Sequence, residues 1–488
     1  MPKAKAKAEF GDFQTPLVLA EDVCRLVRDR IGQPRVVLEP TCGQGAFLSA
    51  ALEVFGDAEA VHGYDVNARH LADAATRIQG HRRAGNVTLL EADFFETDWS
   101  AVLRPLRPPV LVVGNPPWVT SADLGALGSA NLPQKSNPRG LVGLDALTGR
   151  SNFDISEWMV LRLLESLRGV DATLAMLVKT AVARKVLGFL WSGFHAVHGT
   201  AMYAIDAKRH FDAAVDACLF IVRTGGQDNP VGCEVYAGLR AKAPDSILGF
   251  DAGRLVADAA AFQRRRHLQA ESPVGWRSGV KHDCAKVFEL RYLDGCLWNG
   301  YGERVDLEEE VTYPLLKSSH IANDRLDSGR YVILPHRHLG EDTSSLAVVA
   351  PRTWAYLCAH GDRLDARRSS IYRNRPRFCV FGIGDYSFSL WKVAISGLYK
   401  NLRFAVVPPR DGKPVMLDDT VYFLPCATER QALAYAALLN GEAAADFFSA
   451  FLFRDAKRPI TTRLLNRLDL KKLANDRGSP GCRDSETP

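Results

Sequence analysis

Between residues 35 and 223 the chain alternates short apolar runs with longer stretches of helical periodicity. Continuous apolar runs are typical of strands buried on both faces of a parallel sheet, and the intervening helices are then its crossover connections. The pattern therefore predicts a doubly wound α/β domain with a mostly parallel sheet. The predicted strands are 36–39, 60–64, 87–90, 110–113, 173–178 and 217–222.

The pattern becomes irregular beyond a run of turn-forming residues at 224–230. Short β-like stretches then mix with a few helices, which predicts a separate α+β domain. We assign residues 1–240 to the first domain, 241–474 to the second and 475–488 to a disordered tail, because the tail is rich in Asp, Arg, Gly, Ser and Pro. The predicted elements of the second domain include strands at 331–334, 378–381, 404–407 and 421–424 and a helix at 429–439.

One connection inside the first domain is unusually long. Residues 121–152 are rich in Gly, Ser, Asn and Pro and carry Lys135 and Arg139. Compact domains rarely contain such long connections unless they are functional or disordered.

Composition places the chain among globular proteins of the cytoplasm. The 488 residues are 47% hydrophobic and 24% charged, and no apolar run approaches the roughly 18 residues that a membrane span needs. No secretory signal follows the Lys- and Ala-rich start, and the ten cysteines are scattered without a Cys-x-x-Cys pair. We therefore expect a cytoplasmic protein with reduced thiols, no metal and no membrane association. A net charge of +5 permits a polyanionic partner without requiring one.

Three features at the ends of successive predicted strands point to a nucleotide-like cofactor. Gly43 and Gly45 stand in the turn between the first strand and the following helix, where glycine lets the backbone approach a ligand closely. Asp65 closes the second strand, where a carboxylate can accept hydrogen bonds from both hydroxyls of a ribose. Asp93 and Phe94 follow the third strand and suit an adenine edge and face. Each feature alone could be a tight turn or a helix cap.

The segment Asn115-Pro-Pro-Trp118 follows an apolar strand and predicts methyl transfer to an exocyclic base amine. Such an amine is a poor nucleophile until two acceptors localise its lone pair. The Asn115 side chain and the Pro116 carbonyl can serve as acceptors, and Pro117 stiffens the loop. Trp118 can stack on a base that has left the duplex. Phe211 is the candidate for the other face of the base, although it could equally be an ordinary core residue.

With these residues, the chain resembles the gamma-class amino-methyltransferases of restriction-modification systems, the TaqI-like adenine-N6 DNA methyltransferases with a carboxyl-terminal target recognition domain. The resemblance implies S-adenosylmethionine as cofactor and double-stranded DNA as partner. It rests on residues 13–16, 38–47, 64–65, 92–94 and 115–118, in the order of the family's motifs, with residues 152–157 and Phe211 where two later motifs are expected. The cofactor residues it implies, together with their neighbours in these motifs, are Thr15, Pro16, Glu39, Pro40, Cys42, Gly43, Gly45, Phe47, Asp65, Asp93 and Phe94.

Trp118 departs from the commoner Tyr or Phe of the family, which puts details of the base pocket in doubt. In the second half the resemblance is looser. Basic clusters at 263–267 and 363–377 suit phosphate contacts, although solvated helix faces look the same. The candidate DNA contacts are Lys135, Arg139, Lys281, Lys317, Arg373, Arg375 and Lys392.

Several alternatives stay open at this point. Cytosine-N4 methylation uses the same amine chemistry, although Asn rather than Ser at position 115 favours adenine by family analogy. Enzymes that methylate ribosomal RNA or protein glutamines share the Asn-Pro-Pro-aromatic string but need no large basic second domain. A catalytically silent specificity subunit is a further alternative. We expect a monomer that methylates without cleaving, with any restriction endonuclease as a separate protein.

Overall fold

The computed structural model describes residues 14–120, 154–194, 197–226, 231–271, 273–399, 401–453 and 458–476. The chain forms two compact units, which meet between Ala260 and Ala261. The boundary predicted at residue 240 is therefore too early. Strands β9 (Ser246–Asp251) and β10 (Arg254–Val256) follow that position and extend the sheet of the first unit.

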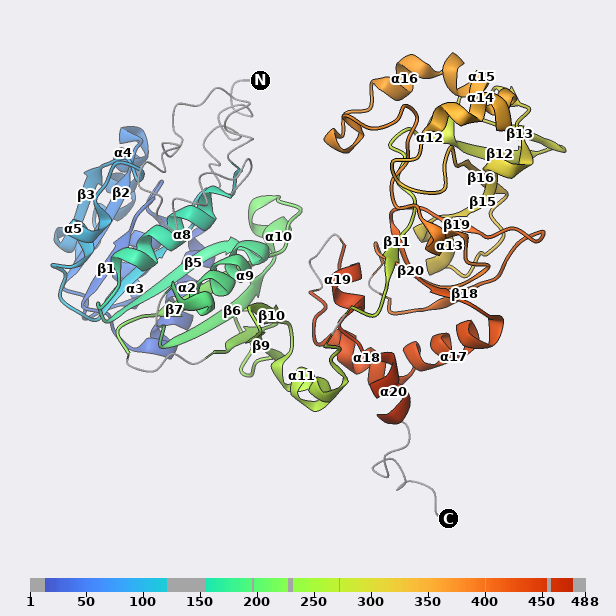
Figure 1. Cartoon of the computed structure of the whole chain (residues 1–488). Helices are drawn as coiled ribbons and strands as arrows, with labels where there is room; N and C mark the ends of the chain where they lie inside the picture. The colour runs from blue at the N-terminus through green and yellow to red at the C-terminus, as the bar shows by residue number, and fades with distance from the viewer. Residues whose placement is uncertain are drawn as a thin grey trace, which may run out of the picture. The chain divides into compact units, whose positions relative to one another are not determined.

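The first unit is the predicted α/β domain (Figure 1). Its remaining elements are α2 (Leu17–Ile31), β1 (Val36–Glu39), α3 (Ala46–Val54), β2 (Ala60–Asp65), α4 (Ala68–Ile78), β3 (Val87–Glu91), α5 (Trp99–Leu103), β4 (Val110–Gly114), α8 (Ile155–Ser166), β5 (Ala172–Lys179), α9 (Thr180–Phe189), β6 (Gly199–Ile205), α10 (Ala207–Phe211), β7 (Ala217–Arg223), β8 (Cys233–Tyr236) and α11 (Ala259–Arg265), the last of which crosses the boundary.

The order of the strands creates a switch point, where a ligand can bind at the carboxyl edge of the sheet. The ten strands lie in the order β10-β9-β8-β6-β7-β5-β4-β1-β2-β3, and β3, β2, β1, β4 and β5 are mutually parallel. Strand order reverses at β1, whose neighbours are β2 on one side and β4 on the other. In doubly wound sheets a ligand binds beyond the carboxyl ends of the strands at such a switch point.

Both faces of this sheet are covered, as the continuous apolar runs predict. All of β4 and nearly all of β5 are buried, although successive side chains of a strand point to opposite faces. One row of helices, α2, α3 and α4, and a second row, α5, α8 and α9, provide the cover. Side-chain caps begin several of these helices: Asn67 caps α4, Asp98 caps α5 and Asp154 caps α8.

All six strands predicted in the first half are present, each within a residue or two of its predicted ends. The prediction did not include β6, which lies between β7 and β8. Its sequence, Gly-Thr-Ala-Met-Tyr-Ala-Ile, contains small residues in place of a strong apolar run. Only its pairing partners mark it as a strand.

The second unit contains a four-stranded sheet in the order β11-β20-β17-β18 and a six-stranded sheet in the order β14-β13-β12-β16-β15-β19. Its strands are β11 (Arg277–Ser278), β12 (Glu289–Leu293), β13 (Cys296–Trp298), β14 (Arg304–Val305), β15 (Thr312–Leu316), β16 (Arg330–Ile333), β17 (Trp391–Ser396), β18 (Ala405–Val407), β19 (Met416–Leu417) and β20 (Val421–Cys426). Its helices are α12 (Ala285–Phe288), α13 (Ser318–Ala322), α14 (Leu346–Val349), α15 (Pro351–Ala359), α16 (Gly361–Asp365), α17 (Glu429–Leu439), α18 (Glu442–Ser449), α19 (Thr462–Leu465) and α20 (Leu470–Asp476).

The α+β class predicted for this unit is correct, and the helix predicted at 429–439 matches α17. The strand predicted at 378–381 is wrong: the segment is irregular, and Phe381 makes only an isolated bridge to Lys281. Its side chains from Phe378 to Val380 are buried, so the apolar run reflects core packing without a sheet. Helix α20 extends to Asp476, past the predicted start of the tail, and residues 477–488 lie outside the described residues.

The cysteines that the structure describes are free thiols. No described helix is both long and apolar enough to cross a membrane.

Candidate active site

A cavity of about 340 Å³ lies at the carboxyl ends of β1, β2, β3 and β4. Because these strands are parallel neighbours, the residues that follow each of them converge there. Ten of the predicted site residues line the cavity: Thr15, Glu39, Pro40, Cys42, Gly43, Asp65, Asp93, Phe94, Asn115 and Pro117.

The Asp65 carboxylate is fixed by backbone donors at the edge of this cavity. Its two oxygens accept hydrogen bonds from the backbone N–H groups of Gly43 and Asn67, each at 2.8 Å. Gly43 has a φ of +50°, and a Cβ at this position would lie 2.8 Å from Oε1 of Gln14. The positive φ therefore favours glycine in this turn, and a Cβ there would also require the Gln14 side chain to shift.

Two buried polar groups in the cavity wall suit a polar ligand. Oε2 of Glu39 and Oγ1 of Thr41 are shielded from solvent, and neither atom has a hydrogen-bond partner in the described part of the chain. Burial, together with the nearby charge of Asp65, raises the pKa of Glu39 well above its usual value. Buried polar atoms are normally satisfied, so a bound group with donors or a positive charge fits this position.

An aromatic cluster forms the wall after β3. Asp93 Oδ1 accepts a hydrogen bond from the Phe95 backbone at 2.8 Å, which orients the carboxylate. The Phe94 ring packs against Trp99 with 4.8 Å between ring centroids, and the indole Nε1 of Trp99 donates to the Phe94 carbonyl at 2.9 Å. Phe95 packs against Trp158 of α8 with 5.4 Å between centroids.

The loop after β4 meets the cavity through Asn115 and Pro117, whereas Trp118 turns into the core. The indole Nε1 of Trp118 donates to the Leu177 carbonyl of β5 at 3.0 Å. The Trp118 and Phe211 rings are both buried and contact each other edge to face, with 5.1 Å between centroids and 70° between planes. A base held between two rings needs a parallel gap of about 7 Å, twice a van der Waals contact. In this arrangement the two rings form no such gap.

Comparison with known proteins identifies the family. The type II methyltransferase M.NspV of Nostoc sp. (strain ATCC 29411 / PCC 7524) is 42% identical over 472 residues, which cover 96% of this chain and 98% of that protein. The chain belongs to the type II methyltransferases. No protein-family model matches it.

The family implies S-adenosylmethionine as cofactor, as the motifs predicted. The cavity suits this cationic, ribose-containing molecule because carboxylates follow three of the strands that border it. Among solved structures, the Type IIL restriction-modification enzyme MmeI in complex with DNA has a TM-score of 0.50 at 14% identity, covering 94% of this chain and 66% of that one. This likeness shows a shared fold.

Three predicted cofactor residues of this methyltransferase do not line the cavity. Pro16 precedes the first turn of α2. Gly45 caps α3 with a φ of +75°, and a Cβ there would lie 2.8 Å from that of Ala74. Phe47 is fully buried in the core. Gly45 and Phe47 therefore shape and support the turn behind the cavity, whereas Pro16 begins α2.

The sequence reasoning missed ten lining residues: Gln14, Thr41, Ala46, Val66, Asn67, Arg69, His70, Ala92, Phe95 and Met159. Most are immediate neighbours of predicted residues and could have been found by extending each motif. Met159 has no such signal, because α8 brings it to the cavity from a distant part of the chain.

The residues predicted to contact DNA differ in their exposure and in their ion pairs. Arg373 and Arg375 are exposed, as a phosphate contact requires. Lys317 Nζ donates to the buried Glu289 at 2.7 Å, and Lys281 Nζ lies 3.7 Å from Asp283. Lys135 and Arg139 lie outside the described residues.

The prediction for Lys392 is wrong. Its residue is only 1% exposed, and its Nζ donates to the Ser389 carbonyl at 2.6 Å inside the second unit. Strand β17 is a central strand of its sheet, between β20 and β18, so the side chain is covered and cannot reach a phosphate.

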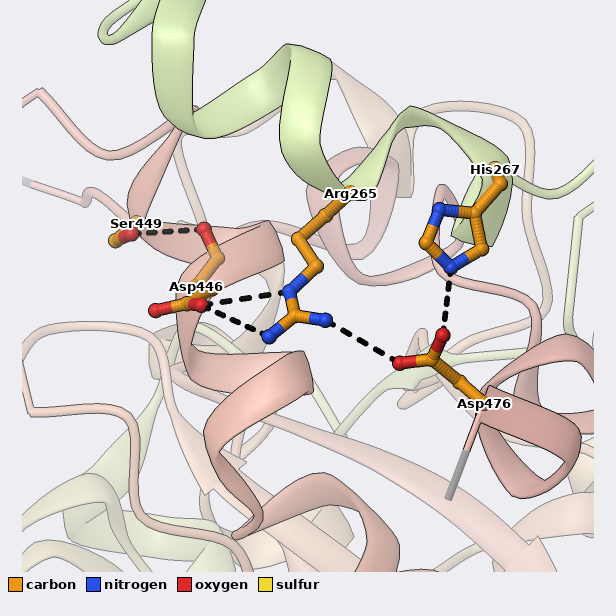
Figure 2. Close-up of polar contacts among 5 residues, drawn as sticks. All are labelled: Arg265, His267, Asp446, Ser449 and Asp476. Carbon is orange, nitrogen blue, oxygen red and sulfur yellow. Dashed lines mark hydrogen bonds and ion pairs between the residues drawn. The ribbon is translucent and has the colours of Figure 1, made fainter. Parts of the chain in front are cut away.

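The basic cluster at 263–267 is partly neutralised within the second unit (Figure 2). The Arg265 guanidinium donates to Asp446 of α18 at 3.2 Å and to Asp476 of α20 at 3.3 Å. His267 Nε2 lies 2.8 Å from the other oxygen of Asp476. These two basic side chains therefore fasten α11 and the turn after it to the carboxyl-terminal helices.

Proposed function

We propose that this type II methyltransferase transfers a methyl group to the N6 amine of an adenine that has left double-stranded DNA. The observation that carries the proposal is the position of Asn115 and Pro117 in the same cavity wall as Glu39, Asp65 and Asp93. An amide side chain at this point can meet a target amine beside the cofactor. The gamma-class, TaqI-like subtype stays a prediction that rests on the order of the motifs.

Four residues are proposed to hold the cofactor. Asp65, at the end of β2, can accept hydrogen bonds from the ribose hydroxyls of the cofactor. Asp93 can accept one from the amine of the cofactor's adenine, with Phe94 against the face of that ring. Glu39 places a carboxyl group in a buried wall, and the cationic part of a bound ligand would stabilise its charged form. When bound, S-adenosylmethionine supplies an electrophilic methyl group on a positively charged sulfur.

The chemistry asked of the protein is acceptance of two hydrogen bonds. Asn115 Oδ1 and the Pro116 carbonyl would accept from the two protons of the target amine, which concentrates the nitrogen lone pair toward the methyl group. Pro116 is itself buried and does not line the cavity, but Pro117 restricts it to extended geometry, which limits the directions that its carbonyl can take. The methylated nitrogen would take over the positive charge of the sulfonium and then lose one of its protons to water, so the step needs no side chain with a shifted pKa.

The aromatic pair would serve base binding only after a local movement. Trp118 is held by its hydrogen bond to Leu177, so Phe211 is the ring that would move. Phe211 is the last residue of the short α10 and is followed by Asp212 with a φ of +55°. Opening the edge-to-face contact would let a base stack on Trp118, at about 1 to 3 kcal/mol of stacking energy.

DNA is the proposed substrate because the fold of both units is shared with MmeI, which was solved in complex with DNA. The exposed Arg373 and Arg375 of the second unit are proposed phosphate contacts. We further propose that the chain protects DNA by methylation and that any cleavage belongs to a separate endonuclease.

Modification sequencing of DNA from a methylation-deficient host tests this proposal. Expression of the chain should produce N6-methyladenine at one recurrent motif, and Asn115→Ala should abolish it while the protein stays folded. Mass spectrometry of the nucleosides separates the alternatives. N4-methylcytosine would replace the adenine proposal, and unmodified DNA from a well-expressed chain would overturn DNA as the substrate.

A further inference from the structure

The carboxyl end of β5 contacts both the loop after β4 and the start of α8. The Leu177 carbonyl accepts the hydrogen bond of the Trp118 indole at 3.0 Å. Two residues further on, Lys179 Nζ donates to Asp154 Oδ2 at 2.8 Å. A short piece of one strand therefore holds the loop after β4 and the start of α8 at the same time.

Asp154 lies where that loop and α8 meet. It forms a β-bridge with Thr120, and the next backbone N–H, of Ile155, donates to the Val119 carbonyl at 2.9 Å. Its Oδ1 accepts from the backbone N–H and the hydroxyl of Ser156, at 3.1 and 2.6 Å, which caps α8. The residues immediately after Trp118 are thus fastened to the first turn of α8.

Helix α8 in turn reaches the cofactor side of the cavity. Met159 lines the cavity, and the Trp158 ring packs against Phe94 and Phe95 with centroid distances of 6.1 and 5.4 Å. A shift of α8 would therefore move the aromatic wall proposed to hold the cofactor adenine. The same shift would move the loop that carries Asn115.

The ion pair is mostly buried, with side-chain exposures of 22% for Lys179 and 8% for Asp154. A buried charge without its partner costs several kcal/mol, so the pair constrains the distance between β5 and α8 strongly. Neither group reaches the reacting atoms in the proposed mechanism. The contribution of the pair is therefore to geometry.

We propose that Lys179 and Asp154 are positioning residues that keep the Asn115–Trp118 loop and α8 in register for methyl transfer. This proposal rests on the function proposed above, in that Asn115 acts on the target amine. Near-attack geometry is sensitive to small displacements, and an error of about 1 Å can cost about 100-fold in rate.

A second ion pair provides a matched control. Lys185 of α9 donates to Glu157 of α8 at 2.8 Å, with side-chain exposures of 53% and 5%. It joins the same helix to α9, which directly follows β5, with a buried carboxylate as acceptor. Unlike Asp154, Glu157 has no bridge to the residues that follow Trp118 among the contacts of the described residues. Because Lys185 is half exposed, loss of this pair should displace α8 little, and the loop stays fastened through Asp154.

The experiment compares Lys179→Met, Asp154→Asn and Lys185→Met in the full chain. Methyl transfer would be measured on whichever amine the wild-type chain methylates, so failure of the adenine proposal is recognised separately. For the first two variants we expect kcat to fall about 10- to 100-fold. Affinity for S-adenosylmethionine, measured by calorimetry, should fall by much less than kcat, because Asp65 and Asp93 are held by backbone donors outside α8. Lys185→Met should keep near wild-type kcat.

Two further variants keep the test decisive if a single substitution prevents folding. Lys179→Arg should recover most of the kcat, because it restores the cation. The double variant Lys179→Met with Asp154→Asn should lose no more kcat than either single one, because both remove the same constraint. Wild-type kcat in the double variant, or an equal loss in Lys185→Met, would overturn the proposal.

Discussion

Replacement of Lys392 by methionine should stabilise the protein, and by more at neutral pH than at alkaline pH. Burial lowers the pKa of this amine from the ordinary 10.5 to about 7. The amine donates to the Ser389 carbonyl, and the Phe423 ring lies 5.9 Å from it. These contacts compensate the charge only in part, so the folded protein favours the neutral amine.

The magnitude follows from the two pKa values. Each pKa unit corresponds to about 1.4 kcal/mol, so keeping Lys392 buried costs up to about 5 kcal/mol at pH 7 and below. Between pH 7 and 10.5 the unfolded chain binds a proton that the folded chain does not, and stability therefore rises with pH. At pH 9.5 only about 1.4 kcal/mol of the cost remains. Methionine removes the cost at every pH but loses one hydrogen bond, worth about 1 kcal/mol.

Thermal unfolding of the full chain, followed by circular dichroism at pH 6.5, 8 and 9.5, measures this effect. Lys392→Met should raise Tm by several degrees at pH 6.5, and the difference from wild type should shrink steadily as pH rises. Lys471→Met, at an exposed position of α20, is the control and should show no such trend. DNA affinity should be unchanged in Lys392→Met. A Tm difference independent of pH would refute the reasoning, and weaker DNA binding would restore Lys392 as a contact.

Three further outcomes are expected. Asp65→Asn should weaken S-adenosylmethionine binding at least tenfold by calorimetry, because it removes a charged acceptor at the cavity edge. It should also lower Tm, because one of the two oxygens that accept backbone N–H groups becomes an NH2 donor. Unchanged affinity would contradict its assignment to the ribose. Gly45→Ala should destabilise the protein by about 1 to 3 kcal/mol in denaturant unfolding, because its positive φ and the contact with Ala74 both oppose a Cβ, whereas Gly56→Ala has open space and should be nearly neutral. Burial raises the pKa of Glu289, but hydrogen bonds from neighbouring cations outweigh this effect and lower the pKa to about 2. The Tm of wild type should therefore exceed that of Glu289→Gln at pH 6, and the difference should disappear as pH falls from about 4.5 toward 2. A difference that persists at pH 2 would show that the charge is not its source.

Local patterns determined most of the first unit. Strands β1, β4, β5 and β7 are compact apolar runs, because strands covered on both faces need apolar side chains at nearly every position, whereas the edge strand β3 is mostly exposed. The same logic located the site: Gly43, Asp65, Asp93 and Asn115 each follow a strand, and parallel strands bring their carboxyl ends together. Short motifs therefore sufficed to predict the cofactor and the reaction type.

Side-chain environment was beyond the reach of these patterns. Lys392 and Arg373 are both basic residues in the sequence, yet Lys392 is buried and Arg373 is exposed. Trp118 and Phe211 were predicted to sandwich a base, but whether two distant rings face each other in parallel or meet edge-on depends on how β5 and α10 pack.

By itself, the sequence determined six of the ten strands of the first unit's sheet, the turn that favours glycine and the residues proposed to accept hydrogen bonds from a target amine. These depend on neighbours along the chain, where φ, ψ and apolar periodicity act over a few residues. Only the tertiary structure decided that β6 completes the sheet, that Met159 reaches the cavity, and that Lys179 joins Asp154 across 25 positions of the chain. Such contacts arise from packing between remote segments, and no local preference of either segment specifies them.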